Sequence, residues 1–171
     1  MKNTSSNLLV FAVALAAAMS LFSCATSSNP LAKAPEEVPL PKDINIVAPS
    51  ANLPKEIAAF SGKWAGKWDG VQGSVLIVEE INDKEARIIL SQEDYPAARE
   101  AVDAGYRRII AKVISSPIPS IEFEIIKRED HPVVTFQMQK DLKTIKGFWV
   151  YNSDQHEDHL PMFRITMKRT N

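Results

Sequence analysis

The sequence has little cysteine or glycine and no surplus of positive charge. Its 171 residues include one Cys and six Gly, and 20 Lys and Arg residues are balanced by 21 Asp and Glu residues. A single Cys excludes an intrachain disulfide framework and a Cys-based zinc cluster. The net charge of −1 argues against a nucleic-acid-binding protein, because such proteins usually carry a basic excess.

Motifs of common enzyme classes are also missing. The sequence has no Gly-x-Ser-x-Gly elbow and no glycine-rich phosphate-binding loop. Acid pairs such as Glu79 and Glu80 are chemically able to perform acid–base catalysis. However, Glu122 and Glu124 alternate with apolar residues, as on the solvated face of a strand. We therefore expect a protein that is not an enzyme and needs no cofactor.

One polar cluster keeps a catalytic alternative open. Residues 154–159 hold five side chains able to bind a metal ion, and Asp154, His156 and His159 are the main candidates. Imidazole and carboxylate groups suit Zn²⁺. The cluster falls between two expected strands, so we interpret it as a solvated acidic turn without a metal. The alternative is a metal-assisted hydrolase.

The first part of the chain has the pattern of a secretory signal. Lys2 precedes the apolar run 8–22, and Ser23 and Cys24 follow it. The run has about 15 residues, which is short of the roughly 20 that span a bilayer as a helix. We expect residues 1–23 to be a signal peptide.

Residues 21–24, Leu-Phe-Ser-Cys, resemble the lipobox of bacterial lipoprotein signals. The resemblance implies cleavage before Cys24, attachment of diacylglycerol to its thiol, and further acylation, for example with palmitate. Ala25, where an Asp would retain an enteric-type lipoprotein in the inner membrane, favours the outer membrane. The covalent lipid would then hold the protein at the bacterial cell envelope. The alternatives are a plain signal peptide with an incidental thiol, and an uncleaved anchor.

Residues 24–55 are expected to be a tether that follows the lipidated Cys24. Six of the 11 prolines lie between Pro30 and Pro54, and the stretch has no Gly and no aromatic residue. Proline blocks helix interiors and central strands, so this part should be extended and poorly ordered. The alternative is that residues 44–47 dock as an edge strand.

Residues 56–171 are expected to form one mainly β domain. Apolar and polar residues alternate with a period of two, which is typical of half-buried strands. Consecutive short strands joined by polar turns predict an antiparallel, eight-stranded up-and-down barrel. One longer connection, residues 94–105, predicts a short helix, because Asp94 can cap it and Gly105 can end it. The expected strands are 64–68, 75–81, 86–91, 108–114, 121–125, 134–138, 145–151 and 163–168.

The domain opens with two Gly-x-Trp units, at residues 62–64 and 66–68. Their even spacing places both indoles on one side of a strand. The pattern resembles the opening strand of lipocalin-like (calycin) β-barrels, and of small bacterial barrel domains that begin with W-x-G-x-W. The resemblance covers residues 59–169. It implies that Trp64 or Trp68 closes one end of the barrel under the basic side chain of Arg169, with ligand contact as a secondary role.

Two functions follow from these expectations. The first is a lipid-anchored cell-envelope barrel that binds a small apolar or envelope-derived ligand, since small barrels can hold one such molecule. The second is a structural or interaction lipoprotein whose barrel is filled by its own side chains. A cavity of several hundred cubic ångströms favours the first, and a filled interior favours the second.

Overall fold

The computed structural model describes residues 38–94, 104–125, 132–150 and 163–170. Several expectations fall outside these ranges and stay predictions. They are the signal peptide with Cys24, the helix proposed within residues 94–105, and the cluster that contains Asp154, His156 and His159. Of the proposed helix, only its ends are described, and Gly105 begins a strand there.

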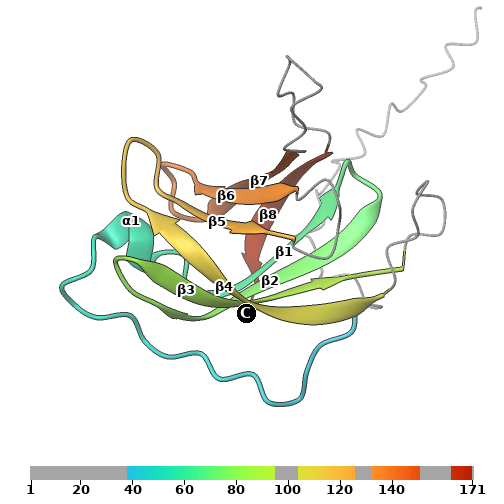
Figure 1. Cartoon of the computed structure of the whole chain (residues 1–171), viewed down its shortest axis with the longest axis horizontal. Helices are drawn as coiled ribbons and strands as arrows, with labels where there is room; N and C mark the ends of the chain where they lie inside the picture. The colour runs from blue at the N-terminus through green and yellow to red at the C-terminus, as the bar shows by residue number, and fades with distance from the viewer. Residues whose placement is uncertain (1–37, 95–103, 126–131, 151–162, 171) are drawn as a thin grey trace, which may run out of the picture.

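The described chain forms a closed antiparallel barrel of eight strands in sequence order (Figure 1). Each strand pairs with the next one along the chain, and the first strand also pairs with the last, which closes the sheet. The predicted mainly β, up-and-down barrel is confirmed. The strands are β1 (Gly62–Trp68), β2 (Gln72–Ile81), β3 (Glu85–Gln92), β4 (Gly105–Ile114), β5 (Ser120–Glu124), β6 (Val133–Met138), β7 (Thr144–Val150) and β8 (Phe163–Thr170).

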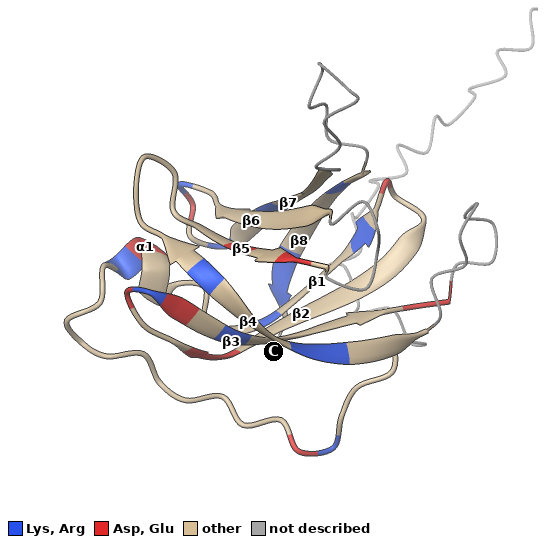
Figure 2. Ribbon diagram, viewed as in Figure 1, with Lys and Arg blue, Asp and Glu red and all other residues tan. Residues whose placement is uncertain are grey.

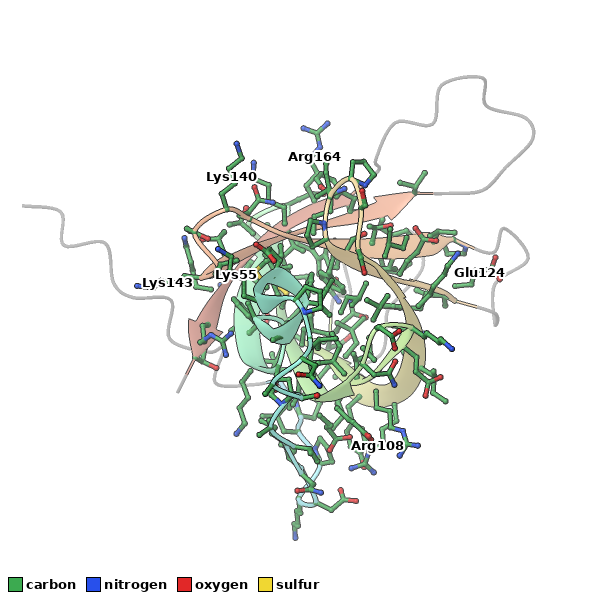
Figure 3. All side chains as sticks on the ribbon, turned by 90° about the vertical axis from the view of Figure 1, so that its left-hand side faces the viewer. Lys55, Arg108, Glu124, Lys140, Lys143 and Arg164 are labelled. Atoms are coloured by element: carbon green, nitrogen blue, oxygen red, sulfur yellow. The ribbon has the colours of Figure 1, made fainter. Side chains whose placement is uncertain are left out.

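Side chains alternate between the interior and the outside along each strand. On β1, Trp64 and Trp68 belong to the main core cluster and are 0% and 2% exposed, whereas Lys67 between them is exposed. Apolar side chains fill the middle of the barrel, and the labelled charged side chains project outward (Figure 3). Basic and acidic segments of the described residues are interspersed along the strands in Figure 2. This distribution agrees with the near-zero net charge.

Gly66 allows β1 and β8 to approach closely. A Cβ atom at this position would lie 2.4 Å from the carbonyl oxygen of Thr166 and 3.1 Å from Cγ1 of Ile165. A backbone atom cannot move aside as the end of a side chain can. The second glycine of the Gly-x-Trp repeat is therefore needed for the contact that closes the barrel.

One end of the barrel is closed by a short helix that the sequence analysis missed. Helix α1 (Lys55–Ala58) begins directly after Pro54 and lies at this end of the barrel (Figure 1). Ile57 and Phe60 are 1% and 0% exposed, and both belong to the main core cluster. Four residues are too few to produce a helical hydrophobic period, so the pattern gave no signal. We call this end of the barrel the α1 end, and the opposite end the far end.

Residues 38–47, which we call the N-terminal arm, lie against the outside of the barrel. The arm is not a strand, but the N–H of Val47 donates a hydrogen bond of 2.7 Å to the carbonyl oxygen of Glu79 in β2. The hydroxyl of Ser91 in β3 donates to the carbonyl oxygen of Pro39. The expectation of a poorly ordered tether is therefore wrong for this part. The alternative, docking at residues 44–47, is closer to what is found.

Apolar contacts hold the arm in place as well. Val38 is 8% exposed and lies in a second apolar cluster on the outer face of the sheet. Ile44 packs against the same cluster. Burial of these side chains removes apolar surface from water on a face that would otherwise be exposed. The sheet residues of this cluster are Ala65, Val75, Ile77 and Ile89.

The strand pairing of the barrel is shortest between β4 and β5. β4 pairs with β3 from Gly105 to Lys112, but with β5 only through Lys112, Val113 and Ile114. β5 has five residues, half as many as the ten of β4. Residues 105–111 therefore have no strand partner on the β5 side within the described part of the chain. This gap positions the site described next.

Candidate binding site

The pair expected from the family resemblance lies at the α1 end. The guanidinium carbon of Arg169 lies 4.4 Å from the centroid of the Trp64 ring. The indole N–H of Trp64 donates a hydrogen bond of 2.7 Å to the carbonyl oxygen of Phe60. Trp64 and Arg169 are direct partners on β1 and β8, so the contact joins the first and last strands. The sequence left two tryptophans open for this role, and the structure places Arg169 over Trp64.

Arg169 also binds the segment between α1 and β1. Its Nη1 donates a hydrogen bond of 2.7 Å to the carbonyl oxygen of Ser61, and its Nη2 donates to that of Ala59. Partial burial lowers the pKa of the guanidinium, which stays charged at any ordinary pH. A guanidinium over an indole contributes about 0.5–2 kcal/mol. These contacts fix the α1 end, where Lys55 and Glu56 of α1 line only a small hollow of about 190 Å³.

Trp68 lies towards the far end, in a group of aromatic rings. Its ring centroid is 6.0 Å from that of Phe136 and 6.2 Å from that of Trp149. The rings of Trp149 and Phe163 are 5.8 Å apart. Such tilted and edge-on pairs add packing energy beyond that of area burial. Trp68 is thus a core residue, and it does not line either of the hollows described below.

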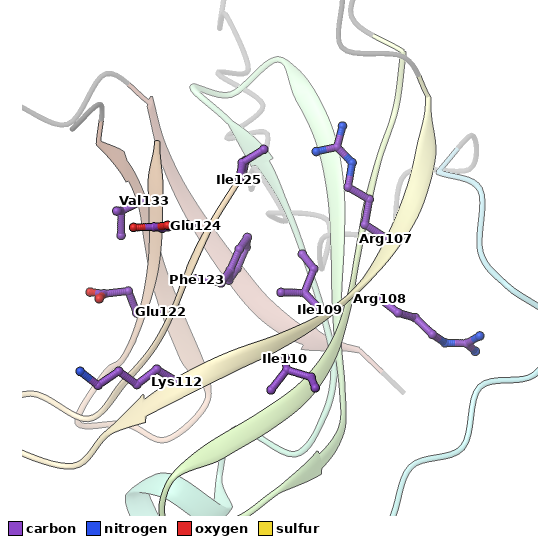
Figure 4. Close-up of a pocket in the computed structure, with 10 residues that line it drawn as sticks. All are labelled: Arg107, Arg108, Ile109, Ile110, Lys112, Glu122, Phe123, Glu124, Ile125 and Val133. Carbon is purple, nitrogen blue, oxygen red and sulfur yellow. The ribbon is translucent and has the colours of Figure 1, made fainter. Parts of the chain in front are cut away.

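The gap between β4 and β5 opens into two hollows. The outer hollow has a volume of about 790 Å³ and is lined by residues of β4, β5 and the start of β6 (Figure 4). The inner hollow, of about 290 Å³, lies on the interior side and also contacts β3. Because four side chains line both hollows, the two meet at the gap. These four are Arg107, Ile109, Phe123 and Ile125.

The strand register explains which side chains face the hollows. Leu90 of the core cluster is directly opposite Arg107, and directly opposite residues share a face of an antiparallel pair. Arg107 and Ile109 therefore belong to the interior face of β4, where Ile109 packs against the core. Phe123 follows Ile121 by two residues and faces inward too. The inner hollow consequently has an apolar wall, and Arg107 is the one cationic side chain among its described lining residues.

Gln92 and Gly105 form the polar edge of the inner hollow. The two residues are direct partners on β3 and β4. Gln92 is 8% exposed, and its buried side-chain amide nitrogen has no acceptor within the described part of the chain. A Cβ atom at Gly105 would meet no atom within 4 Å. A side chain added at Gly105 would therefore extend into the inner hollow, which Gln92 also lines.

Arg108, the neighbour of Arg107, has a different role. Its side chain points away from the hollow in Figure 4. Its Nη2 lies 2.8 Å from Oδ1 of Asp43 in the N-terminal arm, and its Nε lies 3.7 Å from Oε2 of Glu79. The hydrogen bond from Arg108 is the main cause that lowers the pKa of Asp43. Arg108 therefore lines only the outer hollow and holds the arm with its guanidinium, whereas Arg107 lines both hollows.

The other expected site residues give no further site in the described ranges. Within these ranges, no group of three or more His, Cys, Asp and Glu residues is placed to hold a metal ion. Cys24, Asp154, His156 and His159 lie outside them. Sequence analysis also missed the hollow, because it began the β4 strand at residue 108 and left Arg107 outside. Extending the alternation to Gly105 would have placed an arginine on the apolar face.

No protein-family model matches the chain, and no curated protein or solved structure shows significant similarity to it. No helix in the described ranges is long and apolar enough to cross a membrane. The barrel fold and the geometry of the hollow therefore carry the functional argument.

Proposed function

We propose that this protein is a lipid-anchored cell-envelope barrel that binds a small apolar or envelope-derived ligand in the gap between β4 and β5. The observation that carries the proposal is the pair of connected hollows with an apolar wall of Ile109, Phe123 and Ile125. Their volumes fall in or near the range of small-molecule sites, about 300–1,000 Å³. An apolar ligand that covers the part of this wall still reached by solvent lowers the free energy of the complex.

The lipid anchor rests on the sequence. Cys24 stands directly after the apolar run and next to Ser23, in a lipobox-like setting. A lipid at Cys24 would keep the barrel beside a membrane, where apolar molecules are concentrated. The proposal includes no catalysis and no cofactor.

A filled barrel that serves only structural contacts is the competing function. The interior near the α1 end supports it, because Trp64, Phe136 and Met167 are fully buried in the main core cluster. The gap between β4 and β5 opposes it, since a filled structural barrel has no need of an unpaired half-strand that leads to an apolar wall.

The test is titration of the full chain with N-phenyl-1-naphthylamine, a neutral apolar dye that fluoresces when shielded from water. Gly105→Phe is the blocking variant, because Gly105 lines the inner hollow and a Cβ atom there would meet no described atom within 4 Å. We expect saturable binding near one dye per chain that Gly105→Phe weakens about tenfold or more. Equal binding by both proteins would place the dye elsewhere and contradict the proposal.

A further inference from the structure

The described residues that line the inner hollow include hydrogen-bond donors and no Asp or Glu. Arg107 stands at its rim, and the Gln92 amide lies on the neighbouring strand. Two buried indole N–H groups near the far end, those of Trp68 and Trp149, also have no acceptor within the described part of the chain. Among the described residues that line this hollow there is no Asp or Glu, and no described acid forms an ion pair with Arg107. A buried donor without an acceptor is unfavourable, so this end of the barrel is suited to an acceptor.

The acids near the gap belong to its outer side. Glu122 and Glu124 line only the outer hollow, and both alternate with the inward-facing Phe123 on β5. Glu122 is the direct partner of Lys112 across the β4–β5 contact. The hydroxyl of Thr135 also donates a hydrogen bond of 3.3 Å to Glu122. The negative charges therefore face solvent and basic neighbours, and they do not neutralise Arg107 from within.

The polar and apolar residues that line the inner hollow lie at different places along it. At the edge of the inner hollow, Arg107 is directly opposite Leu90, and Gln92 is directly opposite Gly105, so Gln92 and Arg107 are diagonal neighbours. A Cβ atom at Gly105 would meet no described atom within 4 Å. Ile109, Phe123 and Ile125 continue from there towards the gap. A molecule that satisfies both parts has a compact acceptor group at one end and an apolar chain at the other.

We infer that the ligand is a single-chain amphiphile with an anionic head, a carboxylate or phosphate, that Arg107 and Gln92 bind while the chain covers Ile109, Phe123 and Ile125. The inference rests on the proposed function and specifies its ligand class. A guanidinium binds carboxylate and phosphate through charge-assisted, often paired hydrogen bonds. The Gln92 N–H would gain the acceptor that the described residues do not supply.

The test compares three brominated probes on the full chain held in solution by an amphipathic polymer. The probes are 12-bromododecanoate, 12-bromododecyl phosphate and the neutral methyl ester of the first. Bromine quenches tryptophan fluorescence at short range. The ring centroid of Phe123 in the hollow lies 6.3 Å from that of Phe136, which lies 6.0 Å from that of Trp68. A brominated chain bound against Phe123 should therefore quench the fluorescence of Trp68.

We expect one or both anionic probes to bind about tenfold or more tightly than the ester, because a hydrogen bond to a charged group is stronger than one between neutral groups. Arg107→Gln should reduce the affinity for the acid to that for the ester, and Arg107→Lys should keep part of the difference. Arg108→Gln is the matched control, because Arg108 lines only the outer hollow and its guanidinium binds Asp43 in the arm, so this variant should leave the preference intact. Arg107 is exposed, so these variants should fold, which thermal unfolding checks.

Two results would overturn the inference while the proposed function stands. They are equal affinity for acid, phosphate and ester, and an equal loss in Arg107→Gln and Arg108→Gln. Which anionic probe binds more tightly separates a carboxylate ligand from a phosphate ligand. Absence of quenching by all three probes, together with absence of dye binding, would refute both proposals.

Discussion

At the scale of single residues, the two tryptophans of β1 have separate structural roles. Trp64 bonds to the backbone at Phe60 and carries Arg169 over its ring, which fixes the α1 end. Trp68 packs among Phe136 and Trp149 in the middle and far part of the core. Both rings are almost completely buried.

Trp64→Ala and Trp68→Ala should each lower the free energy of unfolding by about 3–5 kcal/mol, as truncation of large buried aromatic side chains does. Chemical denaturation of each variant measures the change. Val71→Ala is the control, because Val71 is 54% exposed and should change stability by less than about 0.5 kcal/mol. A loss below about 1 kcal/mol for both tryptophan variants would contradict the buried core described above.

The contact between Asp43 and Arg108 should make docking of the N-terminal arm depend on pH. Arg108 holds the pKa of the Asp43 carboxyl below its ordinary value of 3.8. A carboxyl with a lowered folded-state pKa contributes stability above the ordinary value, and this contribution is lost as the pH falls through the folded-state pKa. The arm should therefore be held near neutral pH and loosen only below about 3.8.

Hydrogen exchange at the Val47 amide reports this docking, since that amide donates to Glu79. We expect Asp43→Asn to speed this exchange near neutral pH. The difference from the unmodified protein should shrink as the pH falls below 3.8. A difference that stays constant down to pH 2.5 would mean that the carboxylate charge does not hold the arm.

At the scale of elements, the N-terminal arm adds an outer apolar cluster to the β1–β3 face. Val38→Ser should reduce stability by about 1–2 kcal/mol, because it exposes apolar surface that is now buried. Val47→Ser is the matched control, because the Val47 side chain is 46% exposed and its backbone hydrogen bond is kept. Thermal unfolding should separate the two variants. Equal stability of both would argue that the arm does not depend on its apolar contacts.

The strands were predictable because local alternation determines them. All eight expected strands lie within three residues of the observed bounds, since inward and outward positions repeat every two residues. β4 begins at Gly105, three residues before the expected start, and that error hid Arg107. Helix α1 and the docked arm depend on tertiary contacts of Ile57 and Val38, which leave no periodic signal.

The site was less predictable than the fold for a related physical reason. Trp64, Trp68 and Arg169 were found from a local motif and its resemblance. The hollow arises from a mismatch in length between β4 and β5, which only the pairing of strands reveals. In the register of this antiparallel pair, residues 105–111 would need Phe123 and the residues after it as partners, and β5 ends at Glu124.

At the scale of the whole molecule, the proposed function combines the barrel with a lipid attached to Cys24. Cys24→Ser should abolish incorporation of labelled palmitate in bacterial cells, because a serine supplies no thiolate to accept diacylglycerol. The variant should accumulate as precursor and leave the detergent phase. Lys2→Gln is a control that keeps Cys24. Continued fatty-acid labelling of Cys24→Ser would show that the lipoprotein interpretation is wrong.

The central claim is that the gap between β4 and β5 holds an apolar ligand, and native mass spectrometry of the protein isolated from cells tests it most directly. We expect a bound mass of a few hundred daltons on the unmodified protein. We also expect that this mass is released by organic solvent and absent from Gly105→Phe, whose side chain would extend into the inner hollow. A bare mass for the unmodified protein, or the same adduct on Gly105→Phe, would contradict the central claim.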